Sequence, residues 1–267
     1  MLVTISNILA IYRKELQGYF ASPLAYAIAG IFWLLTGYFL VVILLDPQQG
    51  LIPQVAMRDQ MGITEPPIDA PYEFLQIFLR IMGSLSLFIL PMLSMGLYAE
   101  ERKRGTLELL ATSPITNWAV ATGKLLGVLT FYTTLIVPLL GLETIAISAA
   151  TPPVPPTILL LAHGALILLA AGVLSLGMFI SSLTDSTILS AVFTFALVLF
   201  LWVIDALATN LGGPVGGALS HLSLLTNYTN LVKGVLDTSS LIVFASYIIL
   251  GIFLTAQSID ALRFQQS

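Results

Sequence analysis

No charged residue interrupts the stretch Ser22-Pro-Leu-Ala-Tyr-Ala-Ile-Ala-Gly-Ile-Phe-Trp-Leu-Leu-Thr-Gly-Tyr-Phe-Leu-Val-Val-Ile-Leu-Leu45, which lies in a charge-free run that begins at Leu16. A helix needs about 20 mostly apolar residues to cross a bilayer, because its backbone polar groups must be paired inside the hydrocarbon. Pro23 is tolerated here, since a first helical turn does not use the N–H that proline lacks. The stretch is too long, and has the wrong flanks, for a cleaved signal peptide. It therefore predicts a transmembrane helix.

The composition of the whole chain agrees with a membrane protein. Of the 267 residues, 57% are hydrophobic and 9% are charged, and the mean hydropathy is +0.97. A soluble domain carries about 25% charged residues, so this chain lacks the polar residues to cover a water-facing surface. Cysteine is absent, which excludes disulfides and thiolate metal sites. The composition excludes a soluble enzyme and indicates an integral membrane protein.

Further apolar runs along the chain are long enough to cross the membrane. The Pro-rich corner Thr151-Pro-Pro-Val-Pro-Pro156 breaks one long charge-free run into two helices. The sequence therefore predicts an all-α integral membrane protein, with one domain over residues 1–267 and six transmembrane helices. The predicted spans are about 22–45, 74–98, 119–150, 157–181, 187–208 and 241–258.

Lysine and arginine gather on one side of this six-span arrangement. That side holds Arg13, Lys14, Arg102, Lys103, Arg104, Lys124 and Arg263, whereas the other side holds Arg58 and Lys233, with Arg80 just inside a membrane end. Cytoplasmic segments carry the excess of basic residues. We therefore expect a multi-pass protein of the cytoplasmic (inner) membrane, with both termini and residues 99–120 in the cytoplasm.

Three stretches differ from plain spans. Residues 46–73 are polar and Pro-rich, and they predict a flexible outer loop. Residues 212–237 are too apolar for a free loop and too broken for a span, so they predict a short re-entrant or surface helix on the outer face. Residues 1–20 predict a helix lying in the membrane interface, because they mix apolar side chains with the charged residues Arg13, Lys14 and Glu15.

The most informative stretch is Ala99-Glu-Glu-Arg-Lys-Arg-Gly-Thr-Leu-Glu-Leu-Leu-Ala-Thr-Ser-Pro114, which follows the second predicted span. Five consecutive charges leave the membrane, and Gly105 then allows a sharp change of direction. Thr106 can cap a new helix, and Glu108 sits in its first turn, where the helix dipole favours an acid. Pro114 ends that helix. The stretch therefore predicts a short cytoplasmic helix between two membrane spans.

This short helix carries three leucines, Leu107, Leu109 and Leu110. Apolar side chains on so short a helix gain little unless another surface covers them. Either they pack on the protein's own membrane interface, or they fill a groove on a partner. The residues alone leave both possibilities open.

The same stretch resembles a known family. GTLELL, flanked by EER and by SPIT and GK, is similar to the cytoplasmic segment of ABC-2-type transporter permeases, and more narrowly to the gliding-motility and nitrous-oxide-reductase-maturation type. Lys14-Glu-Leu-Gln-Gly-Tyr-Phe-Ala-Ser-Pro-Leu-Ala-Tyr26 is similar to the opening of that group. Leu222-Ser-Leu and Lys233-Gly-Val-Leu-Asp237 are similar to the residues before its last span. The resemblance thus covers nearly the whole chain.

The resemblance implies a fold and a partner. It implies six spans, an interfacial N-terminal helix, and an outer re-entrant helical pair after the fifth span. It also implies that the segment after the second span docks into a groove on a separate ATP-binding subunit. On this sequence the docking role falls on Glu100, Glu101, Arg104, Gly105, Thr106, Leu107, Glu108, Leu109, Leu110 and Pro114.

The implied function is that of the permease subunit of an ATP-driven exporter. ATP and Mg²⁺ would bind the partner ATPase, and no cofactor is expected on this chain. A second permease chain, identical or related, would complete a dimeric pathway. Further expected partners are an accessory subunit with an extracytoplasmic domain and membrane lipid, whereas nucleic acid is not expected.

No catalytic, nucleotide or metal site is predicted on this chain itself. Gly123-Lys124 is the nearest match to a phosphate-binding loop, but Leu125 stands where a Ser or Thr is required. His163 and His221 lack the spacing of metal ligands, so no metal is expected. His163, in the middle of a span, is expected to bond a neighbouring helix.

Arg80, Glu143 and Asp205 are ionisable residues inside predicted spans. Charge inside a membrane is costly, so pairing among polar groups is one expectation for these residues. The other expectation is that each side chain reaches to the nearby outer interface. Gly123 and Gly127 form a GxxxG pattern, which allows two helices to pack closely.

Two other functions stay open from the sequence. A secondary transporter driven by ion gradients would need ionisable residues near mid-membrane and usually repeat symmetry. A membrane scaffold that transmits force from an ATPase without moving a solute would share the motifs of an exporter. The Leu-, Ile-, Val- and Ala-rich spans loosely fit a lipid-linked, polymeric or amphipathic cargo.

Overall fold

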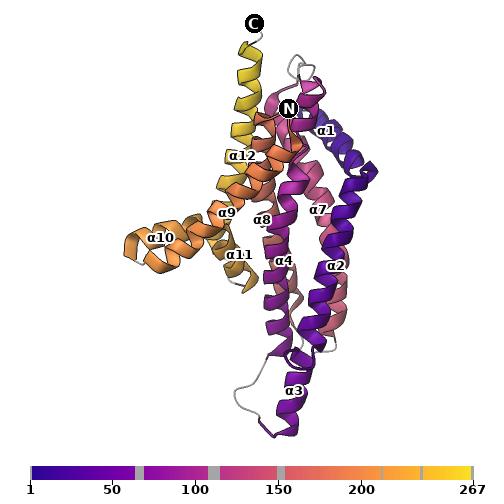
Figure 1. Cartoon of the computed structure of the whole chain (residues 1–267), viewed down its shortest axis with the longest axis vertical. Helices are drawn as coiled ribbons and strands as arrows, with labels where there is room; N and C mark the ends of the chain where they lie inside the picture. Colours follow the sequence, from indigo (N-terminus) through magenta and orange to yellow (C-terminus); the bar gives the residue numbers. More distant parts are fainter. Residues whose placement is uncertain are drawn as a thin grey trace.

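The computed structural model describes residues 2–63, 69–107, 115–148, 154–211, 213–234 and 237–265 (Figure 1). Within these ranges the regular structure is helical, with no strand. Both termini lie toward the same end of a long helical bundle, and α3 lies at the opposite end (Figure 1). The predicted all-α class is confirmed.

Six helices of the described chain are long and apolar enough to cross a membrane, as the sequence predicts. They are α2, α4, α7, α8, α9 and α12. The span that contains α4 also includes α5, because it covers Ala70–Lys103. The bounds of all described helices are α1 (Leu2–Ala21), α2 (Pro23–Leu45), α3 (Leu51–Gln60), α4 (Ala70–Ser94), α5 (Ala99–Lys103), α7 (Asn117–Ser148), α8 (Pro156–Leu183), α9 (Thr187–Leu211), α10 (Gly213–Leu222), α11 (Leu224–Val232) and α12 (Thr238–Gln265).

α8 forms the centre of the bundle and packs against α4, α7, α9, α11 and α12. Two glycines allow the closest of these contacts. A Cβ at Gly177 would lie 2.7 Å from Cβ of Ser94 on α4, and a Cβ at Gly251 of α12 would lie 2.7 Å from Cβ of Ser175 on α8. Helices in a membrane associate through this kind of small-residue packing, because lipid offers no hydrophobic drive between them.

The N-terminal helix α1 packs directly on α7 through the predicted GxxxG pattern, whose close-packing prediction is confirmed. A Cβ at Gly123 would lie 3.0 Å from the carbonyl oxygen of Ile8, and one at Gly127 would lie 2.7 Å from Cβ of Glu15. Farther along α1, Tyr19 stacks on Phe131 of α7 with ring centroids 5.1 Å apart. α1 is therefore fixed to the bundle along much of its length.

Of the two segments predicted at the outer face, residues 46–73 contain a helix that the sequence did not predict, whereas helix was expected in residues 212–237. Residues 46–73, predicted as a flexible loop, include α3, which follows a turn where the Asp46 carboxylate accepts the N–H groups of Gln48 and Gln49 at 2.9 and 2.8 Å. This local capping allows a new helix to begin directly after α2. Residues 213–232 form two consecutive helices, α10 and α11, and α10 projects away from the bundle (Figure 1).

α11 is held against the bundle by one buried tyrosine. The Tyr228 hydroxyl donates to the carbonyl oxygen of Leu79 on α4 at 2.6 Å. Its ring occupies the space left by Gly83, where any Cβ would collide with it. A buried Tyr hydroxyl needs such an acceptor, so this contact fixes where α11 enters the bundle.

Candidate functional site

Lys124 on α7 is the centre of a cluster of charges that joins three helices. Its Nζ donates to the Glu15 carboxylate of α1 at 2.7 Å and to the carbonyl oxygen of Leu97 at 2.8 Å. The Glu101 carboxylate of α5 lies 3.1 Å from the same nitrogen. The ring of Tyr98 lies 4.9 Å from it and adds a cation–π contact. We call Lys14, Glu15, Glu101 and Lys124 the charge cluster.

The buried ammonium in the charge cluster is well compensated. The Lys124 side chain is only 2% exposed, and Glu15 and Glu101 are 14% and 16% exposed. A buried charge is tolerated when its donors and acceptors are satisfied. Here two carboxylates and one carbonyl oxygen surround a single ammonium. Residues of α1, of α7 and of the segment that follows α4 are thereby held together.

Lys14 extends the charge cluster toward solvent. Its Nζ donates to Glu101 at 3.0 Å, although the side chain is 68% exposed. Partial burial opposes the charged form, but the hydrogen bond and the attraction to Glu101, with Glu15 also nearby, raise the pKa of Lys14 above its ordinary value. Lys14 therefore stays protonated at neutral pH, and Glu101 faces two ammonium groups.

The junction between α4 and α5 is fixed from its other side by the end of α8. The Ser181 hydroxyl accepts the backbone N–H groups of Tyr98 and Ala99, both at 3.0 Å, and donates to the carbonyl oxygen of Met95 at 2.8 Å. Arg102 donates to the carbonyl oxygen of Ser182 at 2.9 Å. The start of the predicted docking segment is therefore attached to α8 as well as to α1 and α7.

Part of the predicted docking segment lies inside the described chain. Gly105 has φ +67°, a left-handed conformation that glycine adopts without strain, and the chain turns there. The Thr106 hydroxyl donates to the carbonyl oxygen of Glu101 at 3.2 Å, and Leu107 is buried. Glu100 and Arg104 form an exposed pair at 3.4 Å.

The rest of that segment, with Glu108, Leu109, Leu110 and Pro114, lies outside the described residues. The roles predicted for these four residues stay predictions. On α1, Arg13 is exposed and lies outside the charge cluster, which its neighbours Lys14 and Glu15 join.

The other flank of the docking segment is attached to a different helix. The Asn117 side chain at the start of α7 donates to the Asp260 carboxylate of α12 at 2.6 Å. Next to it, the rings of Trp118 and Phe253 lie 5.9 Å apart. The two flanks of the segment are thus connected to α1 and α7 on one side and to α12 on the other.

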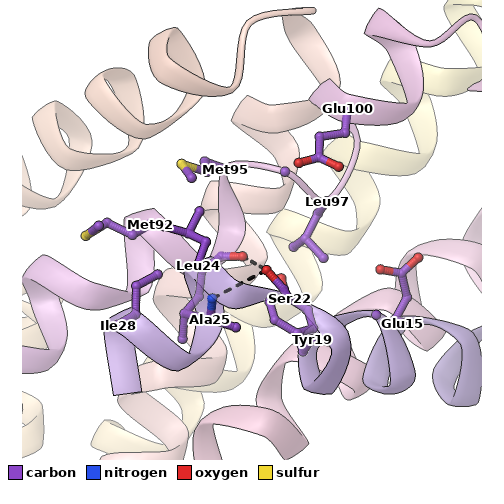
Figure 2. A pocket seen from close by; sticks show the side chains of 13 residues that line it. Glu15, Tyr19, Ser22, Leu24, Ala25, Ile28, Met92, Met95, Leu97 and Glu100 are labelled. Atoms are coloured by element: carbon purple, nitrogen blue, oxygen red, sulfur yellow. Dashed lines mark hydrogen bonds between the residues drawn. The ribbon is translucent and has the colours of Figure 1, made fainter. Parts of the chain in front are cut away.

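A groove runs beside the charge cluster, between α1 and the α4–α5 junction. It consists of two adjoining hollows of about 200 and 420 Å³ that share Glu15, Gly18, Gly96, Leu97 and Glu100. In Figure 2, Glu15 and Glu100 lie on opposite sides of the first hollow, whose other end is lined by apolar side chains.

Of the three ionisable residues predicted inside the spans, Glu143 meets a partner from outside that set. Glu143 on α7 is fully buried, and its Oε1 lies 3.3 Å from Nε2 of His163 on α8. His163 thus contacts a neighbouring helix, and its Nδ1 lies 3.0 Å from the carbonyl oxygen of Leu159. Arg80 is exposed on α4, and no ion pair joins it to Glu143 in the part of the chain that the structure describes. The side chain of Asp205 lies outside the described residues.

The residues that organise this region were not predicted from the sequence. Lys124 contributed to the charge bias, to a rejected nucleotide motif and to the GK of the family resemblance, but it was given no structural role, and neither were Tyr98 and Asn117. One signal could have identified Lys124: it is the only charge between Asn117 and Leu142, inside a predicted span. A lone lysine at such a position requires a partner. Among the described residues, no group of three His, Asp or Glu side chains is arranged to hold a metal.

Comparison with known proteins gives one clear result. A comparison with individual curated proteins gives no match. The model of the family described as ABC-2 family transporter protein matches residues 9–266, which is nearly the whole chain. The family identifies a membrane transport component, and the six apolar helices agree with a multi-pass integral membrane protein. The chain belongs to the ABC-2 family of transporter proteins.

Proposed function

We propose that this chain is the permease subunit of an ATP-driven exporter of the gliding-motility and nitrous-oxide-reductase-maturation type, and that it couples to a separate ATPase through residues 100–114. Two permease chains would form the pathway, with both termini in the cytoplasm. The observation that carries the proposal is the charge cluster, because it connects the start of the docking segment to two other helices through one buried lysine.

In the proposed mechanism, the helices that the charge cluster joins move together. Closure of the ATPase dimer would push on residues 100–114. Because Glu101 shares Lys124 with Glu15, the push would move α1, α5 and α7 together. On the other flank, Asn117 would pass the motion to α12 through Asp260. Packed helices with two discrete arrangements can convert such a local movement into opening of a path.

The chain itself has no part in ATP hydrolysis in this proposal. Its sequence has no phosphate-binding loop, because Gly123-Lys124 is followed by Leu125. In the structure, Lys124 already bonds two carboxylates and a carbonyl oxygen, so it is not free to contact a phosphate. ATP and Mg²⁺ would bind the partner.

The test is purification of the complex from native membranes in mild detergent, with the permease chain tagged. We expect a nucleotide-binding subunit to co-elute, and vanadate-sensitive ATP hydrolysis to appear only when it is present. Lys124→Met should keep the ATPase bound but weaken the effect of the permease on its turnover. Hydrolysis by the isolated chain, or a native complex without a nucleotide-binding subunit, would contradict the proposal.

An ion-driven secondary transporter is the second candidate, and the buried contact between Glu143 and His163 is the observation that favours it. Intramembrane ionisable residues often belong to proton pathways. Transport by reconstituted vesicles separates the two candidates. An ATP-driven exporter should be inhibited by vanadate and insensitive to a protonophore, and a secondary transporter should respond in the opposite way.

A further inference from the structure

The groove beside the charge cluster changes its character along its length. Its first hollow is lined at one end by Leu24, Ile28 and Met92, and at the other by Glu15 and Glu100. Leu24 and Met92 are 47% and 40% exposed, so the apolar end opens to the outside of the bundle. Figure 2 shows this end beside the elbow between α1 and α2. The second hollow continues from the carboxylates toward basic side chains.

The charged end of the groove offers both signs of charge in equal number. The bases are Lys14, Arg104 and Lys124, and the acids are Glu15, Glu100 and Glu101. Inside this set, Lys124, Glu15 and Glu101 are largely buried, and Lys124 pairs with both carboxylates. Lys14, Arg104 and Glu100 remain 68%, 73% and 55% exposed, so they can bind a further group.

We propose that this groove binds one zwitterionic phospholipid with a primary amine headgroup, such as phosphatidylethanolamine. Lys14 and Arg104 bind its phosphate, Glu100 binds its amine, and its acyl chains leave past Leu24 and Met92. An anionic lipid has no positive group on its headgroup to pair with Glu100. A cationic amphiphile would be repelled by the two exposed bases, Lys14 and Arg104. A zwitterion complements both signs.

The position of the groove also favours a lipid over a soluble ligand. α1 has the composition of a helix at the level of lipid headgroups, and α2 begins directly after it as a candidate span. A lipid in the adjoining leaflet can therefore place its headgroup at the charged end while its chains stay in hydrocarbon. Gly18 leaves this passage open, because nothing lies within 4 Å of where its Cβ would be. The proposal concerns a bound membrane lipid and does not depend on the proposed export.

The experiment is native mass spectrometry of the purified chain in detergent, titrated separately with phosphatidylethanolamine, phosphatidylglycerol and phosphatidylcholine. We expect one tightly retained phosphatidylethanolamine per chain. Glu100→Gln should weaken its binding roughly tenfold, the factor expected for losing one charge-assisted hydrogen bond. The same variant should improve binding of phosphatidylglycerol. Arg104→Gln should weaken binding of all three lipids, because each carries the phosphate.

Glu73→Gln is the matched control, since Glu73 is exposed near the start of α4 and does not line the groove. It should bind each lipid as the unchanged chain does. Glu100 and Arg104 are exposed, so their variants should melt at the same temperature as the unchanged chain. An unchanged melting temperature would show that the binding losses are local. Equal binding of the three lipids, no retained lipid, or identical binding by Glu100→Gln and Glu73→Gln would overturn the proposal.

Discussion

The charge cluster and the Glu143–His163 contact each join one ionisable side chain of α7 to other helices, but their polar groups are paired to very different degrees. In the cluster, the Lys124 ammonium has two carboxylates and a carbonyl oxygen within 3.1 Å. In the other region, Glu143 has only the 3.3 Å approach of His163. Neither carboxylate oxygen of Glu143 makes a hydrogen bond with the described residues, whereas Glu101 in the cluster lacks a partner only at Oε2 and meets two ammonium groups at Oε1.

The difference indicates different roles for the two regions. A polar network in which the buried ammonium and its carboxylates are paired makes its helices rigid relative to one another. A buried polar group with poor partners adds little to stability, and apolar residues of similar volume often replace such a pair without loss. We therefore expect the cluster to stabilise one arrangement of α1, α5 and α7. The Glu143–His163 contact should contribute little to the folded state.

The largest effect should come from removing the lysine of the cluster. Lys124→Met leaves the largely buried Glu15 without its countercharge and leaves Glu101 with Lys14 alone, and breaking a buried pair in this way typically costs about 3–5 kcal/mol. We expect the melting temperature of the detergent-purified chain to fall by several degrees. Lys103→Met is the matched control, because Lys103 is exposed on α5, and it should change the stability by less than about 0.5 kcal/mol. Equal melting temperatures for the two variants would show that the cluster does not stabilise the fold.

A smaller effect should come from separating α1 and α7 without changing a charge. In Gly127→Val, the new Cβ would begin 2.7 Å from Cβ of Glu15, so α1 must move outward. Overpacking of this kind typically costs about 1–3 kcal/mol. Limited proteolysis should then cut α1 faster, and the melting temperature should fall less than in Lys124→Met. Gly141→Val is the control on the same helix, since nothing lies within 4 Å of its Cβ position. Equal proteolysis of both variants would argue against close docking of α1.

The smallest net effect should come from replacing both partners of the Glu143–His163 contact. Glu143→Leu alone removes one partner of a buried contact and should cost about 1–3 kcal/mol. The double variant Glu143→Leu/His163→Leu should recover most of that loss, because no buried polar partner is left behind. In the cluster, Glu101→Gln/Lys124→Met should recover little, since Glu15 and the carbonyl oxygen of Leu97 still lose their donor. Thermal melts of both double variants beside their single variants measure this contrast. Similar recovery in the two regions would remove the distinction between them.

The sequence predicted the parts of the fold that depend on local composition. Charge-free runs identified the helical class and the number of candidate spans, because the length of apolar sequence alone decides whether a helix can span. The GxxxG pattern at Gly123 and Gly127 predicted close packing, but it could not identify α1 as the partner. That pairing depends on how α1 folds back onto a helix more than 100 residues later in the chain.

The candidate site was less predictable than the fold, because its contacts join distant positions. Glu101 and Lys124 are separated by a turn and a docking segment, and their contact requires α5 and α7 to be held in one geometry. Asn117 begins α7 and Asp260 lies near the end of α12, so these two residues meet only when the bundle has folded. The docking roles of residues 100–114 remain predictions from the resemblance.

The central claim is that α1, α5 and α7 move as one unit when the ATPase acts. The chain has no cysteine, so spin labels at Gln17→Cys on α1 and Lys103→Cys on α5, on a chain diluted with unlabelled chain so that each complex carries one labelled copy, would report the distance within that chain by pulsed electron paramagnetic resonance. In the complex with its ATPase, we predict one narrow distance distribution that is the same without nucleotide and with ATP and vanadate. Adding Lys124→Met should broaden it. A distance between α1 and α5 that changes with nucleotide while Lys124 is present would contradict the account.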